Sequence, residues 1–274
     1  MEQITRIAER PHATRDTRSD ARVTVLTPPP HHAVEVPVDF TDTMVFRLPA
    51  VQLDPAVRER ERILPPGATG QHGGAYKMLR TQVLKRMDQL GATTIGIFSA
   101  GSAEGKTLTA INLAIAIAAE SGRTTLLVDF DLRNPSIHRR FGHSPAVGVE
   151  DCLQQRHPIH EAMFKVAGYE RLTILPARER SEQSSELLTS DRAIELVTEI
   201  RTRYANRVVI FDLPPVLQAD DALAFARHLQ AGLLVIGDGK ASGDDVKRTI
   251  ELLRDLPIVG TVLNGSRDPE KNYY

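Results

Sequence analysis

The sequence predicts a three-layer α/β fold with a mainly parallel sheet. Beyond residue 70, continuous apolar runs of strand length alternate with longer helical segments, as they do where helices cover both faces of a parallel sheet. The chain of 274 residues is long enough for one domain of this kind with an appendage. Its 41% apolar residues can supply the core that such a domain buries.

Residues 1 to about 70 have the composition of an arm rather than of a core. Prolines cluster at 28–30 and again at 65–66, and apolar residues occur only in short groups. Such a segment buries too little apolar surface to fold alone, so we expect it to be mostly disordered. Two stretches of helical composition interrupt it, at 2–10 and 54–63. We therefore expect residues 71–274 to fold without the arm.

The elements of the domain follow from its apolar pattern. The segment at 75–90 is an amphipathic helix with Leu79, Val83 and Met87 on one stripe. The expected strands lie at 93–99, 124–130, 171–177, 207–213, 231–237 and 257–264. The expected helices lie at 106–121, 187–204, 220–228 and 244–256, with a broken helical region after the second strand.

Charge and cysteine content exclude several classes of function. With 34 basic and 35 acidic side chains the net charge is -1, so no bulk field attracts nucleic acid and none is expected as a partner. The single cysteine, Cys152, excludes an internal disulfide framework and a multi-cysteine zinc site, which suits a reducing cytoplasm. The first residues lack the apolar core of a signal peptide, and no run approaches the roughly 20 apolar residues of a membrane span. A membrane role therefore requires a partner.

The strongest motif is a strand ending at Ser99, a loop of small residues, and a helix opened by Gly105, Lys106 and Thr107. Small residues let backbone amides close around phosphate oxygens, the lysine reaches the outer phosphates, and the threonine hydroxyl ligates Mg²⁺. A strict phosphate loop has glycine at position 100, where this chain has Ala100, and Gly101 can supply the flexibility. An ordinary helix N-cap would not explain the lysine. The expected nucleotide contacts are Gly101, Ser102, Ala103, Glu104, Gly105, Lys106, Thr107 and Leu108.

Aspartates end two of the other expected strands. Asp129 and Asp131 follow one strand and Asp212 ends another, at the sheet edge where ligands bind in such folds. A single aspartate there is also explained by a helix N-cap or a surface turn. Three of them facing a phosphate loop favour a site that holds Mg²⁺ through water and accepts a hydroxyl proton.

These motifs resemble, in kind and order, those of the bacterial tyrosine kinases that control capsule and exopolysaccharide export, the CpsD/CapB type. The resemblance is greatest to the kinases of exosortase-linked (PEP-CTERM) polysaccharide loci. It covers roughly residues 72 to 265 and rests on EGKT at 104–107, DFDLRNPSIHRRFG at 129–142 and FDLPPVL at 211–217. The fold implied is that of the P-loop NTPases, and the activity implied is ATP-dependent tyrosine (auto)phosphorylation.

The resemblance also implies a role for each site residue. Lys106 would stabilise charge on the transferring phosphoryl group, and Thr107 would ligate Mg²⁺ directly. Asp131 and Asp212 would hold the ion through water, and Asp129 would accept the proton of the tyrosine hydroxyl. The implied cofactors are ATP and Mg²⁺.

Two further residues have open assignments. Arg133 either positions the loop, pairs with a phosphate, or forms a salt bridge. Asn264, at the end of the last expected strand, lies where related ATPases contact adenine, although an asparagine in a strand-end turn is an equal explanation.

The alternative function is a MinD/ParA-like ATPase switch, whose output is nucleotide-dependent dimerisation and partner binding. Those proteins share the fold, but they carry a second lysine five residues before the lysine of the phosphate loop. Gly101 stands at that position here, and the run of Asp129, Asp131 and Arg133 is absent from them. Both observations favour the kinase.

The chain departs from the kinase family at two places. Its tyrosine tail consists of Tyr273 and Tyr274, the expected autophosphorylation sites, where family members usually carry a longer cluster. Family members form a ring through a helix with the pattern E-x-x-R-x-x-R, and this chain has Gly74, Lys77 and Arg80 at the three positions. The glutamate, which is half of an intersubunit ion pair, is therefore missing. The resemblance implies a homo-oligomer, but this helix does not supply the complete ring contact. The resemblance further implies a membrane-embedded polysaccharide co-polymerase of the chain-length type as activator. This partner would hold a cytoplasmic protein at the inner face of the plasma membrane.

Overall fold

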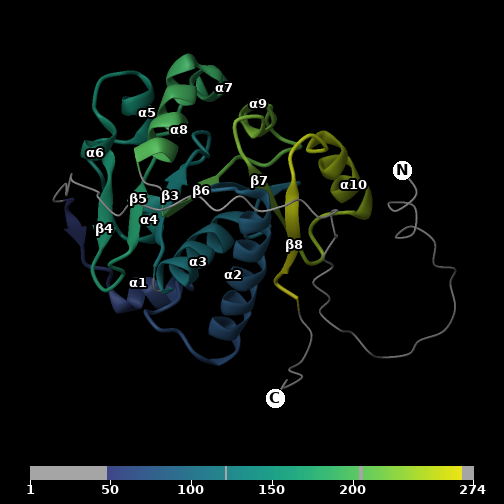
Figure 1. Ribbon diagram of the computed structural model, residues 1–274, viewed down its shortest axis with the longest axis horizontal. Coiled ribbons are helices and arrows are strands. Elements are labelled where there is room, and N and C mark those ends of the chain that lie inside the picture. The colour runs from purple at the N-terminus through teal and green to yellow at the C-terminus, as the bar shows by residue number, and fades with distance from the viewer. Residues whose placement is uncertain (1–47, 121, 204–205, 267–274) are drawn as a thin grey trace, which may run out of the picture. The chain divides into compact units, whose positions relative to one another are not determined.

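The computed structural model describes residues 48–120, 122–203 and 206–266, and at their centre lies an eight-stranded sheet with the order β1-β4-β5-β3-β6-β2-β7-β8 (Figure 1). The strands are β1 (Ala50–Val51), β2 (Thr94–Ser99), β3 (Thr124–Asp129), β4 (Phe164–Val166), β5 (Leu172–Leu175), β6 (Arg207–Asp212), β7 (Ala231–Gly237) and β8 (Ile258–Asn264). All neighbouring strands pair in parallel except β4 and β5, which are antiparallel. The predicted mainly parallel sheet is thus confirmed.

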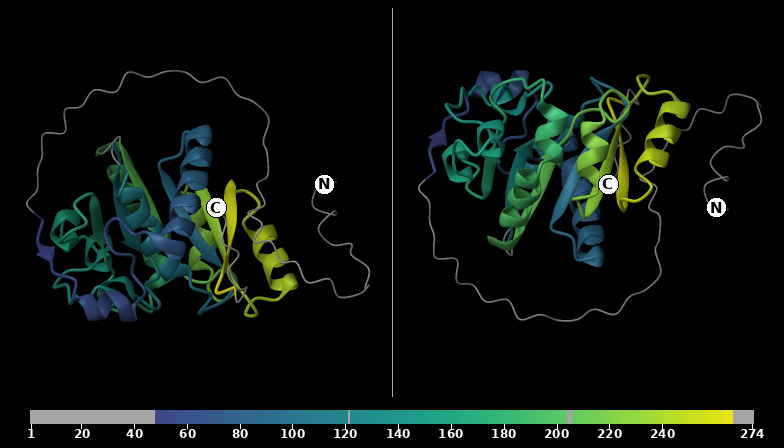
Figure 2. Two further views of the ribbon diagram at one scale, coloured as in Figure 1. Left: turned by 90° about the horizontal axis from the view of Figure 1, so that it is seen from below. Right: turned by 90° about the horizontal axis from the view of Figure 1, so that it is seen from above.

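Helices cover both faces of this sheet. They are α1 (Pro55–Arg60), α2 (Gly70–Leu90), α3 (Lys106–Ala118), α4 (Ile137–Arg140), α5 (Val149–Leu153), α6 (Ile159–Ala162), α7 (Ser184–Thr189), α8 (Asp191–Arg203), α9 (Asp221–Ala226) and α10 (Gly243–Leu252). Residues of α2 and α3 belong to one hydrophobic cluster, and residues of α8 and α9 belong to a second. The helices and the sheet can be followed in the ribbon views of Figure 2. The three-layer α/β fold expected from the apolar pattern is confirmed.

The order of the strands brings the motifs together. Strand β2, which leads into the phosphate loop, lies between β6 and β7, and β6 lies between β2 and β3. Asp129 at the end of β3 is in register with Asp212 at the end of β6. Because all three strands are parallel, their carboxyl ends meet at one edge of the sheet, as expected for the ligand site of such a fold.

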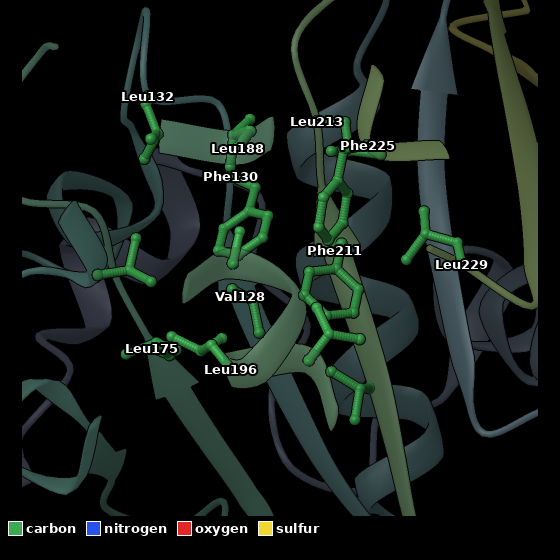
Figure 3. Close-up of a cluster of buried hydrophobic side chains, with 14 of the residues drawn as sticks. Val128, Phe130, Leu132, Leu175, Leu188, Leu196, Phe211, Leu213, Phe225 and Leu229 are labelled. Atoms are coloured by element: carbon green, nitrogen blue, oxygen red, sulfur yellow. The ribbon is translucent and has the colours of Figure 1, made fainter. Parts of the chain in front are cut away.

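An aromatic cluster supports this edge from one face of the sheet. Phe130 follows Asp129, Phe211 precedes Asp212, and both rings pack against Phe225 of α9 (Figure 3). The ring centroids lie 4.8 to 5.3 Å apart, within the range of favourable aromatic pairs. The phenylalanines therefore fix the backbone positions from which the two carboxylates project.

The region expected to be broken helix contains more order than the sequence indicated. It includes the short helices α4, α5 and α6 and the strand β4. β4 is only three residues long and pairs with both β1 and β5. A strand of this length has too little periodicity to be recognised before its partners are known.

The segment from 48 to 69 corrects the expected boundary near residue 70. β1 pairs with β4, helix α1 forms within the expected stretch 54–63, and Ile63 and Leu64 are buried in the same cluster as α3. The Asn112 side chain of α3 accepts a hydrogen bond from Leu64 N at 2.9 Å and donates one to Arg62 O at 3.0 Å. These described residues are therefore part of the domain, while the expected helix at 2–10 lies outside the described residues.

A truncation tests this boundary. We expect a chain that begins at residue 71 to be less stable than one that begins at residue 48 by roughly 4 kcal/mol or more, because it loses two buried aliphatic side chains and leaves the Asn112 amide unpaired. Thermal unfolding of the two truncated chains measures the difference. Equal melting temperatures would show that the folded domain begins near residue 70, as the sequence predicts.

None of the helices in the described ranges has both the length and the apolar character needed to cross a lipid bilayer.

Candidate active site

The loop between β2 and α3 contains two residues with positive φ angles. Gly105, directly before α3, has a φ of 91°, and Ala103 has a φ of 59°. Successive residues with αR and αL conformations turn their N–H groups toward one side and form a concave anion site, to which the free N–H groups of the helix N-terminus add. Ala103 is not a glycine, so its left-handed conformation is strained, and such strain is typical of functional loops.

Lys106, the first residue of α3, points at the two aspartate-bearing strands. Its Nζ lies 2.6 Å from Asp212 Oδ1 and 3.5 Å from Asp131 Oδ2, and the residue is only 6% exposed. Burial alone would lower the pKa of Lys106, but the charges of Asp212 and Asp131 outweigh it and the pKa is raised. The ammonium therefore stays charged at the mouth of the loop.

Asp212 binds both reactive side chains of the loop. While Oδ1 accepts from Lys106, Oδ2 accepts a hydrogen bond from the Thr107 hydroxyl at 2.6 Å. No group of three or more His, Cys, Asp or Glu among the described residues could hold a metal by itself. A hydroxyl next to one carboxylate, with a second carboxylate nearby, fits Mg²⁺ instead, because this ion is usually held by one or two carboxylates, water and substrate phosphates.

Asp129 lies behind this group and is fully buried. Its Oδ2 accepts hydrogen bonds at 3.0 Å from the backbone N–H groups of Ser136 and Ile137, and Oδ1 accepts one at 3.3 Å from Asp131 N. Burial, together with the charge of Asp212, raises the pKa of Asp129 to about 8 in spite of these backbone bonds. The carboxylate thus also fixes the turn that carries Asp131.

This shift makes the stability of the protein depend on pH. The pKa of Asp129 is about 8 when folded and about 4 when unfolded, so between these values the folded chain binds more protons and loses stability as the pH rises. We expect Asp129→Asn to flatten the decrease in melting temperature between about pH 5 and pH 8. Asp255→Asn, which alters an exposed aspartate, should keep the wild-type slope, and parallel curves for all three proteins would contradict the shift.

Asp131 and Arg133 face the cavity beside the loop. Burial, together with the charge of Asp212, raises the pKa of Asp131, although the nearby Lys106 ammonium opposes the shift. Arg133 forms a bidentate ion pair with the buried Asp221, at 2.8 and 2.9 Å. Of the alternatives for Arg133, the salt bridge is therefore present, and it ties the segment after β3 to the start of α9.

The cavity has a volume of about 470 Å³. All eight expected loop contacts, Gly101 to Leu108, line it together with Asp131 and Arg133. Asp129, Asp212 and Asn264 do not line it, since the two aspartates lie behind the wall and the Asn264 side chain is turned toward the loop backbone.

Several lining residues were not expected from the sequence. They are Ser99, Asn134, Ser136, Arg140, Pro214, Pro215, Gln218 and Ala219. Five of them lie in the two motifs that carry the aspartates, 129–142 and 211–217, so only the placement of those motifs next to the loop could have found them.

Two predicted features lie elsewhere. Tyr273 and Tyr274 are outside the described residues. Arg80 of α2 is directed at α3, where it donates to Ala116 O at 3.3 Å and pairs with Glu120 at 3.3 Å. An arginine at the position of the family's ring helix thus contacts its own chain.

Known proteins are similar to this chain over much of its length. The family model of the CobQ/CobB/MinD/ParA nucleotide binding domain matches residues 95–273. The tyrosine-protein kinase YwqD of Bacillus subtilis is 30% identical over 204 residues, which cover 73% of this chain and 84% of YwqD. The succinoglycan biosynthesis transport protein ExoP of Rhizobium meliloti is 34% identical over 179 residues, which cover 62% of this chain and 22% of ExoP.

Solved structures include similar domains. The kinase domain of the Escherichia coli tyrosine kinase ETK superposes with a TM-score of 0.66 at 27% identity. The match covers 74% of this chain and 79% of that domain.

Proposed function

Because this chain belongs to the bacterial tyrosine-protein kinases, with a nucleotide-binding domain of the CobQ/CobB/MinD/ParA type, we propose that it transfers the γ-phosphoryl group of ATP to tyrosine, its own tail included, and regulates the synthesis and export of capsular or exopolysaccharide. One observation carries the proposal: Lys106 and Thr107 of the phosphate loop converge on Asp212, across from Asp129 and Asp131. Phosphoryl transfer depends mainly on such positioning and charge.

Each side chain has a part in this proposal. The Lys106 ammonium, which Asp212 holds at 2.6 Å, supplies positive charge beside the transferring group. The Thr107 hydroxyl would hold magnesium directly, and the Asp131 and Asp212 carboxylates would hold it through water. Magnesium, when bound with the nucleotide, supplies further positive charge on the phosphate oxygens.

The proton of the tyrosine hydroxyl has two candidate acceptors. The family resemblance assigns the role to Asp129, whereas the structure places Asp131 on the wall of the cavity. Both carboxylates have raised pKa values, which suits a base that must take a proton near neutral pH. A pH–rate profile separates them, because only replacing the true base by asparagine removes the rise of the transfer rate with pH.

Partners and location form the outer part of the proposal. ExoP is named a transport protein, and this chain covers 22% of it, which supports a kinase unit that works with a polysaccharide export machine. We propose a membrane-embedded polysaccharide co-polymerase as activator, self-association of the kinase, and action at the cytoplasmic face of the membrane. Pull-down of this chain with membranes that contain the co-polymerase, compared with membranes that lack it, tests the interaction.

The second candidate function is a nucleotide switch of the MinD/ParA type, whose members share the matched family. Gly101 stands where those proteins carry their second lysine, and its backbone N–H is bonded to Glu104. Both functions require MgATP, so nucleotide binding alone does not separate them.

Transfer of label from [γ-³²P]ATP to the protein separates the two functions. We expect the wild-type chain to become labelled on tyrosine, and removal of Tyr273 and Tyr274 to abolish most of the label while nucleotide binding persists. A chain that binds and hydrolyses ATP without acquiring label would be a switch and not a tyrosine kinase.

A further inference from the structure

Glu104 is a buried acidic side chain inside a loop that is shaped to bind anions. The residue is only 3% exposed, and its carboxylate bonds two backbone groups on different elements. Oε1 accepts from Gly101 N at the start of the loop, and Oε2 accepts from Gly237 N, at the end of β7, at 2.9 Å. A buried carboxylate is tolerated only where such bonds replace its water, so this side chain holds the loop against β7.

Asn264 reaches the same residue from the neighbouring strand. Its Nδ2 donates to Glu104 O at 2.9 Å from the last position of β8. The contact is close, because a Cβ at Gly105 would lie only 1.8 Å from that nitrogen. Glycine at 105 is therefore required both by its φ of 91° and by the asparagine packed against it.

The Asn264 side chain is thus held against the loop by one of its N–H groups. It donates to the loop backbone, and it is not among the described residues that line the cavity. An adenine contact would require the same amide to face the cavity. Lys240, in the turn after β7, adds a third connection by donating to Ala103 O, at the residue with the strained φ of 59°.

We infer that Glu104 and Asn264 are positioning residues that clamp the phosphate loop to the ends of β7 and β8, and that Asn264 supports the binding of phosphates and does not select the base. The inference rests on the nucleotide site of the proposed function, and it is independent of transfer to tyrosine. Because the clamp touches only the loop, it affects every ligand that carries a chain of phosphates, with or without a nucleoside.

Binding of three probes tests the clamp: MgATP, MgGTP and magnesium tripolyphosphate, each measured by calorimetry at one magnesium concentration. We expect Asn264→Ala to weaken all three by a similar factor, about tenfold, because the loss of one hydrogen bond to buried backbone removes that much. Glu104→Gln should act in the same direction, since an amide offers one acceptor oxygen for two N–H groups. The matched controls are Leu263→Ala and Glu251→Gln, both of exposed side chains, and these should bind like the wild type.

Each other outcome contradicts the inference in a different way. Weaker MgATP binding with unchanged tripolyphosphate binding would assign Asn264 to adenine. Wild-type affinity of both variants for all three probes would show that Glu104 and Asn264 do not position the phosphate loop. If the wild-type chain binds no probe, the nucleotide site itself is wrong, and the proposed function fails with it.

Discussion

Replacing Lys106 by methionine is expected to lower phosphate transfer by about 100-fold or more, the usual effect of removing one charged group that faces the developing charge of a transition state. The Lys106 ammonium lies at the mouth of the phosphate loop and is buried, so water screens its charge little. Methionine keeps the length and the packing of the side chain but supplies no charge. Labelling with [γ-³²P]ATP measures the effect.

The same change removes the cation that Asp131 and Asp212 share, so folding has to be measured together with activity. Thermal unfolding should show a folded protein, because neighbouring carboxyls can take up a proton once the ammonium is gone. Lys106→Arg keeps a positive charge and serves as a second variant if the methionine variant does not fold. Lys247→Met, of an exposed lysine on α10, should retain full transfer, and wild-type transfer by Lys106→Met would exclude the phosphate loop from the mechanism.

The strands of the central sheet were predictable because each is buried on both faces. Strands β2, β3, β6 and β7 are buried along nearly their whole length and carry consecutive apolar residues instead of an alternating pattern, which is typical of strands covered on both faces. The adjacency of the three aspartates to the phosphate loop followed from the same pattern, because parallel strands present their carboxyl ends at one edge.

The segment from 48 to 69 was not predictable in the same way. Its attachment depends on contacts far apart in the sequence, such as the 48-residue separation between Leu64 and Asn112. In the sequence, Asn112 is a polar residue within a mostly apolar helix, and nothing near it indicates a partner. In the fold it satisfies two backbone groups of the segment, which only the folded arrangement reveals.

The roles of Glu104 and Asn264 were hidden for a related reason. A glutamate in a phosphate loop and an asparagine at a strand end each have several ordinary explanations when they are considered singly. Their shared contact spans 160 residues, and it exists because β2 and β8 both flank β7. Strand order is not encoded in local periodicity, so the sequence alone left the assignment of Asn264 open.

Asp212→Asn and Asp129→Asn are expected to separate magnesium binding from proton transfer. Asp212 uses one oxygen for Lys106 and the other for Thr107, and an amide would turn an NH₂ group toward one of these donors. The Asp212 carboxylate orients the Thr107 hydroxyl, which is proposed to ligate magnesium directly. Because the amide would disturb this contact, we expect the magnesium concentration for half-maximal transfer to rise about 10- to 100-fold. Titration of transfer activity with magnesium at saturating ATP measures this shift.

Asp129→Asn should behave differently in the same titration. Its carboxylate contacts backbone N–H groups and neither Lys106 nor Thr107, so nucleotide affinity should stay within about tenfold and the magnesium requirement should not change. If Asp129 and not Asp131 is the proton acceptor, transfer at saturating magnesium should nevertheless fall by about 100-fold or more, because an amide can neither accept the hydroxyl proton nor hold the turn of Asp131 as a carboxylate does. If both variants recover wild-type transfer at high magnesium, or neither does, the proposed division between magnesium binding and proton transfer is wrong.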